Sequence, residues 1–199
     1  MKFISIGPYC QTVDILKTHN LRTEAYPFDY IFSSLKIVEH CINNKFNIFL
    51  DKNYYINGTD KNSTRHSFYC KFLDTPILLK HHIKFGYSND YKVSNGNLFN
   101  HHNLIENDDN YEKFKRRCNR LLNLIENNEK IVFVYYNCYI DEYDDIIEFY
   151  NNFSYYKNII IIGIFENNND KKILYENKNC KIYQNYDMSS IFNEIKLTF

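Results

Sequence analysis

The pattern of apolar and polar positions is clearest in the last third of the chain. Residues 131–136 and 158–165 are nearly continuous apolar runs, which are typical of strands buried on both faces. Apolar positions at helical spacing predict a helix over residues 111–125, with Asp108 or Asp109 as its N-cap. This part of the chain therefore predicts a helix followed by two buried strands.

The same alternation continues to the end of the sequence. Residues 141–153 predict a helix that begins with acidic side chains, residues 181–183 a further strand, and residues 189–195 a final helix. Strands that alternate with helices indicate a parallel sheet with helices on both faces. We therefore expect an α/β fold of three layers with a mostly parallel sheet.

The beginning of the chain predicts a strand, a turn and a helix. Residues 2–6 form a short apolar run that Gly7 and Pro8 interrupt, and Val13 and Leu16 then follow at helical spacing. Cys10 is expected at or just before the start of this helix.

The middle of the chain predicts less regular structure. After an aromatic run at residues 26–32, Ser33 or Ser34 is expected to cap a helix that reaches about residue 46. Short apolar runs in the segment 51–107 predict strands separated by long loops, at residues 54–56, 68–72, 77–85 and 91–93. No repeat or linker interrupts the sequence, so we expect one domain over residues 1–199.

Composition and charge exclude several classes of protein. With 24 basic and 24 acidic side chains the net charge is zero, which argues against a general nucleic-acid or membrane-surface binder. Abundant Asn, Lys, Ile, Tyr and Phe have A/T-rich codons and indicate a microbe or a large virus. The chain begins with no signal-like apolar run and has none long enough to span a membrane, so we expect a cytoplasmic protein.

The cysteines show no metal-binding spacing. None of the six belongs to a C-x-x-C pair, so no metal is expected, and we expect free thiols. The usual glycine-rich phosphate loops are also missing, and no cofactor is expected.

Cys10 is the strongest candidate for chemistry. Ligands of open parallel sheets lie beyond the carboxyl ends of the strands, which is where Cys10 and, after a later strand, Asn137 and Cys138 are expected. The orphan N–H groups and dipole at a helix start would lower the pKa of Cys10 and could hold an oxyanion. The alternative is a small buried residue that fills the turn.

A catalytic thiol needs a base, and histidine is the usual one. Candidates are His66, the pair His81 and His82, and the pair His101 and His102. Paired histidines are more often surface or hydrogen-bonding residues than catalytic ones.

Two further groups have competing interpretations. Asp29, between bulky rings, either caps the following helix or orients a histidine or substrate group. Arg116 and Arg117 could bind a phosphate or carboxylate, although a solvated helix face is the commoner role.

The motifs as a set resemble a known family. Four segments resemble proteins labelled papain-like cysteine peptidases. They are the run Gly7-Pro8-Tyr9-Cys10-Gln11, the segment 26–31 with its Pro-Phe-Asp-Tyr, the segment 99–102 ending in two histidines, and the tyrosine-led helix with Arg116-Arg117. The resemblance covers roughly residues 3–136. It implies Cys10 as nucleophile and His102 or His101 as base. Tyr30 replaces the usual tryptophan, and Pro8 removes a backbone donor near the oxyanion position.

The expected architecture differs from that family label. Papain-like enzymes carry the cysteine on a long helix against a β-rich part, whereas a cysteine after the first strand of a parallel sheet is closer to a Rossmann-like or SGNH hydrolase-like fold. Capsule acetyltransferases with a Gly-Asn-Cys-Gln turn are similar at Cys10-Gln11.

Three functions follow. The first is a thiol-dependent hydrolase of a peptide or other acyl substrate, in which Cys10 attacks, His102 or His101 takes the proton and Asp29 orients. The second is an acyltransferase to a sugar, with a donor held by Arg116 or Arg117. The third is a non-catalytic binding protein. In the first two of these functions, Gln11 and Asn137 would contact the substrate. The sequence does not indicate an oligomeric state.

Overall fold

The sheet of the computed structural model is mostly parallel, as the sequence predicted. The structure describes residues 1–84, 86, 92, 96–138, 143–167 and 169–198. In spatial order, the sheet consists of β1 (Lys2–Ser5), β4 (Ile131–Asn137), β5 (Ile159–Phe165), β7 (Cys180–Gln184) and β6 (Lys172–Asn177). Each neighbouring pair is parallel except β6 with β7.

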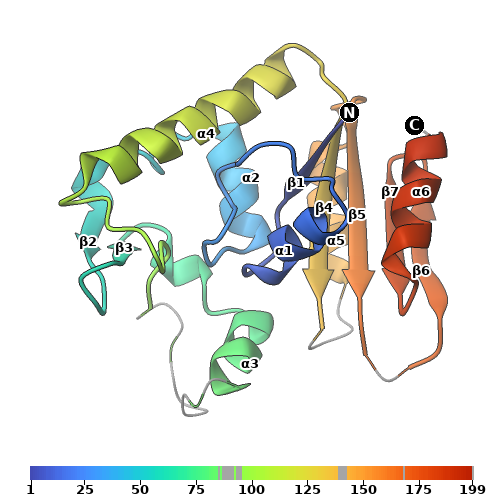
Figure 1. Cartoon of the computed structure of the whole chain (residues 1–199), viewed down its shortest axis with the longest axis horizontal. Coiled ribbons are helices and arrows are strands. Elements are labelled where there is room, and N and C mark those ends of the chain that lie inside the picture. Colours follow the sequence, from blue (N-terminus) through green and yellow to red (C-terminus); the bar gives the residue numbers. More distant parts are fainter. Residues whose placement is uncertain (85, 87–91, 93–95, 139–142, 168, 199) are drawn as a thin grey trace.

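Helices cover both faces of this sheet (Figure 1). One face carries α1 (Gln11–Thr18) and α6 (Met188–Thr198), and the other carries α2 (Leu35–Asn43), α4 (Asp108–Glu126) and α5 (Asp144–Phe153). Strand β4 supplies both cores, because successive side chains of a strand point to opposite faces. Its residues Phe133 and Tyr135 pack with the second group of helices, whereas Val132 and Val134 pack with the first. The expected three layers are confirmed.

The middle segment is the part that the apolar pattern predicted least well. It contains η1 (Lys52–Tyr54), the antiparallel hairpin β2 (Tyr55–Asn57) and β3 (Thr64–His66), η2 (Cys70–Phe72) and α3 (Pro76–Lys84). The hairpin lies at the edge of the molecule beside α4, and α3 lies at the end of the molecule where the sheet strands finish (Figure 1).

Of the strands predicted in this segment, the first overlaps β2 and two are wrong. Residues 68–72 contain the 3₁₀ turn η2, and residues 77–84 belong to the helix α3. Pro76 favours this helix because proline is pre-organised for a first helical turn, and Thr75 Oγ1 accepts a hydrogen bond from the N–H of Leu78 at 3.3 Å. The run predicted at residues 91–93 lies largely outside the described residues.

Helix ends differ from the predictions for local reasons. Ser34 caps α2 by accepting from the N–H of Ile37 at 3.4 Å, as predicted, but this helix ends at Asn43 because Lys45 and Phe46 have left-handed φ angles of 54° and 60°.

The N-cap of α4 is Asn107, which accepts from the N–H of Asn110 at 3.0 Å. The prediction of Asp108 or Asp109 as cap was therefore wrong, and both carboxylates lie in the first turn, where the helix dipole favours negative charge.

The remaining boundaries agree with the sequence within a few residues, apart from one strand that was missed. The helix predicted to start at residue 141 is described from Asp144, because residues 141 and 142 lie outside the described part. Strand β6 was not predicted, because it is an edge strand whose side chains are largely exposed. Within the described residues, no helix has both the length and the apolar character to cross a membrane.

Candidate functional site

The turn that follows β1 is tightly packed. A Cβ atom on Gly7 would lie 1.8 Å from Thr12 Oγ1, so only glycine fits there. Ser33 fixes the turn from outside, since its N–H donates to Pro8 O at 3.1 Å and its hydroxyl donates to Gly7 O at 3.0 Å. The turn therefore presents the next residues, Tyr9 and Cys10, in a fixed position.

Cys10 lies at the strand-to-helix turn, as the sequence predicted. It is the N-cap residue of α1, its carbonyl accepts from the N–H of Asp14 at 3.1 Å, and its side chain is exposed. The alternative of a buried residue that only fills the turn is therefore wrong.

The expected lowering of the Cys10 pKa is also wrong. Partial burial raises the pKa of this thiol, and the Asp14 carboxylate raises it further; a hydrogen bond from the backbone of Cys10 lowers it by less. Burial, with the negative charge of Asp14 one helical turn away, outweighs the backbone hydrogen bond at the helix start. Cys10 is therefore mainly a thiol at neutral pH and needs a base to become a nucleophile.

Replacing Asp14 by asparagine is expected to lower the pKa of Cys10, because it removes the nearby negative charge. The rate of Cys10 alkylation by iodoacetamide at pH 7 should rise a few-fold, since the thiolate is the reacting form. The pH dependence of labelling, followed by mass spectrometry of residues 3–17, measures this.

A matched control separates the effect of the Asp14 charge from the effect of the hydrogen bond that Asp14 accepts. The Tyr30 hydroxyl donates to Asp14 Oδ1 at 2.8 Å, so Tyr30→Phe removes that bond and keeps the carboxylate. An equal rise in labelling in both variants would show that the charge of Asp14 is not the cause.

The end of β4 meets the Cys10 turn. The Tyr9 hydroxyl donates to Asn137 Oδ1 at 3.4 Å and lies 3.9 Å from Cys138 Sγ, and the Cys138 thiol donates to Gln11 Oε1 at 3.4 Å. The amide nitrogen of Gln11 has no hydrogen-bond partner among the described residues. Gln11 and Asn137, the two residues predicted to contact substrate from the strand ends, thus both lie at this turn, and Asn137 is buried there.

An imidazole from α3 also reaches this turn. The ring of His81 stacks on Tyr9 with centroids 4.4 Å apart and planes 13° apart, and Phe32 packs against its edge. Burial lowers the pKa of His81 to about 4, helped by the nearby charges of His82 and Lys84. His81 is therefore neutral at pH 7 and able to accept a proton. The sequence named the His81–His82 pair without choosing it; the helix-starting Pro76 was the signal that could have placed it.

His101 and His102 lie in a different environment. The ring of His102 packs on Phe114 of α4 with centroids 5.1 Å apart, and burial together with Arg117 lowers its pKa to about 4. His101 is exposed and lies 3.3 Å from the amide of Asn100. Among the described residues, neither histidine makes a hydrogen bond to Cys10.

Asp29 is buried in an ion pair. It accepts from Arg22 Nε at 2.8 Å and from the N–H of Tyr26 at 3.1 Å, and these are its hydrogen-bond partners among the described residues. Its proposed role as cap of the next helix was wrong, because Ser34 caps α2.

Arg116 and Arg117 point to different surroundings. Arg116 is exposed, whereas Arg117 is half-buried, with its guanidinium 4.9 Å from the ring centroid of Phe114 and close enough to Asp29 to influence the pKa of that carboxyl.

A cavity of about 280 Å³ lies away from the Cys10 turn, since the residues that line it do not include Cys10, Tyr9 or Gln11. Its walls come from the start of α2, the η2 region, the start of α3 and α5, and its charged residues are Lys36, Glu39, Lys71, Asp74, Asp145 and Glu148. Within the described part of the chain, no group of three or more His, Cys, Asp or Glu side chains is placed to hold a metal ion.

Comparisons with known proteins agree with the family resemblance of the sequence. The model of the family described as "Putative papain-like cysteine peptidase (DUF1796)" matches residues 1–158. Searches of the curated proteins and of the solved structures gave no match. Since the family model covers most of the sequence, the chain belongs to this putative papain-like cysteine peptidase family.

Proposed function

We propose that the protein is a thiol-dependent hydrolase of an amide or ester, with Cys10 as the nucleophile. The observation that carries this proposal is the exposed Cys10 thiol at the turn after β1, where the preceding residue, Tyr9, contacts Asn137 and stacks on the His81 imidazole. Ligands of parallel sheets bind at this edge, and the family label points to the same chemistry.

In the proposed reaction the Cys10 sulfur attacks the substrate carbonyl carbon and gives its proton to an imidazole. The C–S bond forms while the carbonyl oxygen gains negative charge, which the Gln11 amide N–H groups can stabilise. The imidazolium then protonates the leaving group, and water releases the acyl group from Cys10.

We favour His81 as the base, because it stacks on the residue that precedes Cys10. His102 or His101, which the family resemblance implies, is the alternative for the same role. The buried ion pair of Asp29 favours a positioning role over direct contact with either histidine.

The hydrolase is preferred over the acyltransferase because the family description points to a peptidase. A peptide or small acyl substrate fits the proposal, and the six free cysteines support the cytoplasm as its location.

The test uses p-nitrophenyl acetate as the acyl donor. We expect release of p-nitrophenol, with one acetyl group trapped by acid quenching on the peptide of residues 3–17. Cys10→Ser should reduce turnover by at least about 10³-fold, and His81→Asn by about 10²- to 10⁴-fold. His102→Asn and Cys70→Ser are the matched controls. Unchanged turnover in Cys10→Ser would overturn Cys10 as the nucleophile, and no release of p-nitrophenol above the buffer rate would favour a binding protein. A loss confined to His102→Asn would move the base role there.

A further inference from the structure

The two accessible thiols of the chain gather at one place. Of the six free cysteines, Cys41, Cys70, Cys118 and Cys180 are buried in the protein, whereas Cys10 is exposed and Cys138 is partly exposed. Cys10 follows β1 and Cys138 follows β4, and these strands are adjacent and parallel, so both thiols lie at the same edge of the sheet.

The contacts of Cys138 place it against both neighbours of Cys10. Its sulfur lies 3.4 Å from Gln11 Oε1 and 3.9 Å from Tyr9 Oη, across 127 and 129 residues of sequence. A thiol is a weak donor, so these contacts stabilise the present arrangement only slightly. The Cys138 side chain is therefore held only weakly in its present contacts beside the Cys10 turn.

We propose that Cys10 and Cys138 are a thiol pair that a peroxide converts into an intramolecular disulfide. The thiolate fraction of Cys10 attacks one oxygen of hydrogen peroxide: an S–O bond forms, the O–O bond breaks, and the other oxygen leaves as hydroxide, which takes up the proton that Cys10 lost and becomes water. Cys138 then attacks the Cys10 sulfur, so that the S–S bond forms, the S–O bond breaks and a second water leaves.

The electrons balance in these two steps. Two thiols lose two electrons, and one hydrogen peroxide is reduced to two waters. The pairing does not depend on Cys10 being the hydrolytic nucleophile, although it would block that activity reversibly if it is. A thiol reductant then restores both cysteines.

Peptide mapping of the full chain tests the pair. After treatment with hydrogen peroxide, blocking of free thiols and tryptic digestion without reductant, we expect one cross-linked species that joins residues 3–17 to residues 131–157. It should be two hydrogens lighter than the sum of the peptides and should disappear with dithiothreitol.

Two variants make the outcome specific. Cys138→Ser should lose the cross-link and instead accumulate the sulfenic acid of Cys10, which dimedone traps. Cys180→Ser removes a buried thiol and should leave the cross-link unchanged. Three results with the protein that carries no substitution would overturn the proposal. They are a dimedone adduct at Cys10 without the cross-link, no oxidation of Cys10, or a cross-link that joins two chains.

Discussion

Replacement of Asp29 by alanine is expected to lower the free energy of unfolding by about 3–5 kcal/mol. The Asp29 side chain is almost fully buried, and its carboxylate neutralises the Arg22 guanidinium at 2.8 Å and accepts from the Tyr26 N–H. The variant leaves a charge and a donor without partners in a place that water hardly reaches. Urea unfolding at pH 7 measures the loss.

The pKa of the Asp29 carboxyl reflects opposing influences. Burial is the largest influence on Asp29 and raises its pKa, while Arg22, Tyr26 and Arg117 lower it by less. The expected cost of Asp29→Ala at pH 7 therefore comes from the Arg22 guanidinium and the Tyr26 N–H that lose their partner.

The control for Asp29→Ala removes both charges together. The double variant Arg22→Met with Asp29→Asn keeps an acceptor for the Tyr26 N–H, and it is therefore expected to recover most of the stability. A cost below about 1 kcal/mol for Asp29→Ala alone would contradict the structural role of the ion pair. Asp29 would then have to be re-examined as a residue that acts on the substrate.

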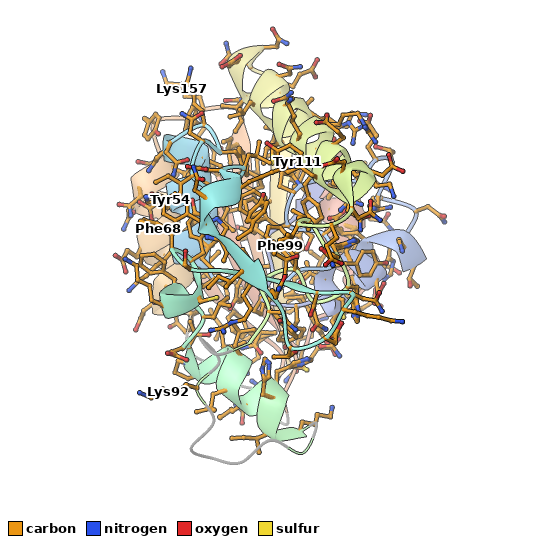
Figure 2. The ribbon with its side chains drawn as sticks, turned by 90° about the vertical axis from the view of Figure 1, so that its left-hand side faces the viewer. Tyr54, Phe68, Lys92, Phe99, Tyr111 and Lys157 are labelled. Carbon is orange, nitrogen blue, oxygen red and sulfur yellow. The ribbon has the colours of Figure 1, made fainter. Side chains whose placement is uncertain are left out.

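Acid is expected to destabilise the protein through His66. This residue is buried, its Nε2–H donates to Ile48 O at 3.1 Å, and its Nδ1 accepts from the Tyr69 N–H at 3.3 Å. A carbonyl can only accept and an amide N–H can only donate, so the fold requires the neutral ring. Aromatic rings surround it, with Tyr54 stacked at 5.6 Å and Tyr69 at 4.6 Å. Figure 2 shows this side of the molecule, with Tyr54, Phe68 and Phe99 labelled.

The expected pH window follows from the pKa of His66. Burial lowers the pKa of His66 from 6.5 to about 4. Between these two pH values His66 is mostly protonated in the unfolded chain but mostly neutral in the folded protein. Stability is therefore complete above about pH 6.5 and falls as the pH approaches 4. At 1.36 kcal/mol for each unit, the loss from His66 is about 3 kcal/mol.

A variant without this imidazole isolates the effect. His66→Phe should be less stable at pH 7 by about 1–3 kcal/mol, because Ile48 O and the Tyr69 N–H lose their partner. The gap between the two proteins should narrow as the pH falls to 4, as followed by urea unfolding. The exposed His101 gives the matched control, His101→Asn. Parallel curves for the unmodified protein and His66→Phe between pH 7 and 4 would contradict the prediction.

The sequence alone determined the buried strands of the sheet and the position of Cys10. Strands β4 and β5 are continuous apolar runs because both of their faces are buried, and such runs are visible without any knowledge of their partners. The strand, Gly7 turn and helix around Cys10 are likewise local, as is the Ser34 cap of α2. A signal of this kind depends on residues a few positions apart.

Only the tertiary structure decided which groups surround Cys10. His81 reaches Tyr9 because α3 is a helix docked at the edge of the sheet, and the short apolar run of α3 is equally compatible with a strand. Cys138 meets Gln11 because β4 pairs with β1, and no local pattern states the order of strands.

The raised pKa of Cys10 has the same origin. A helix start predicts a lowered pKa, but the outcome depends on how deeply the thiol is buried and on the charge of Asp14. Periodicity tells which residues face inward, whereas the chemistry of this site arises from contacts that only the packed chain creates.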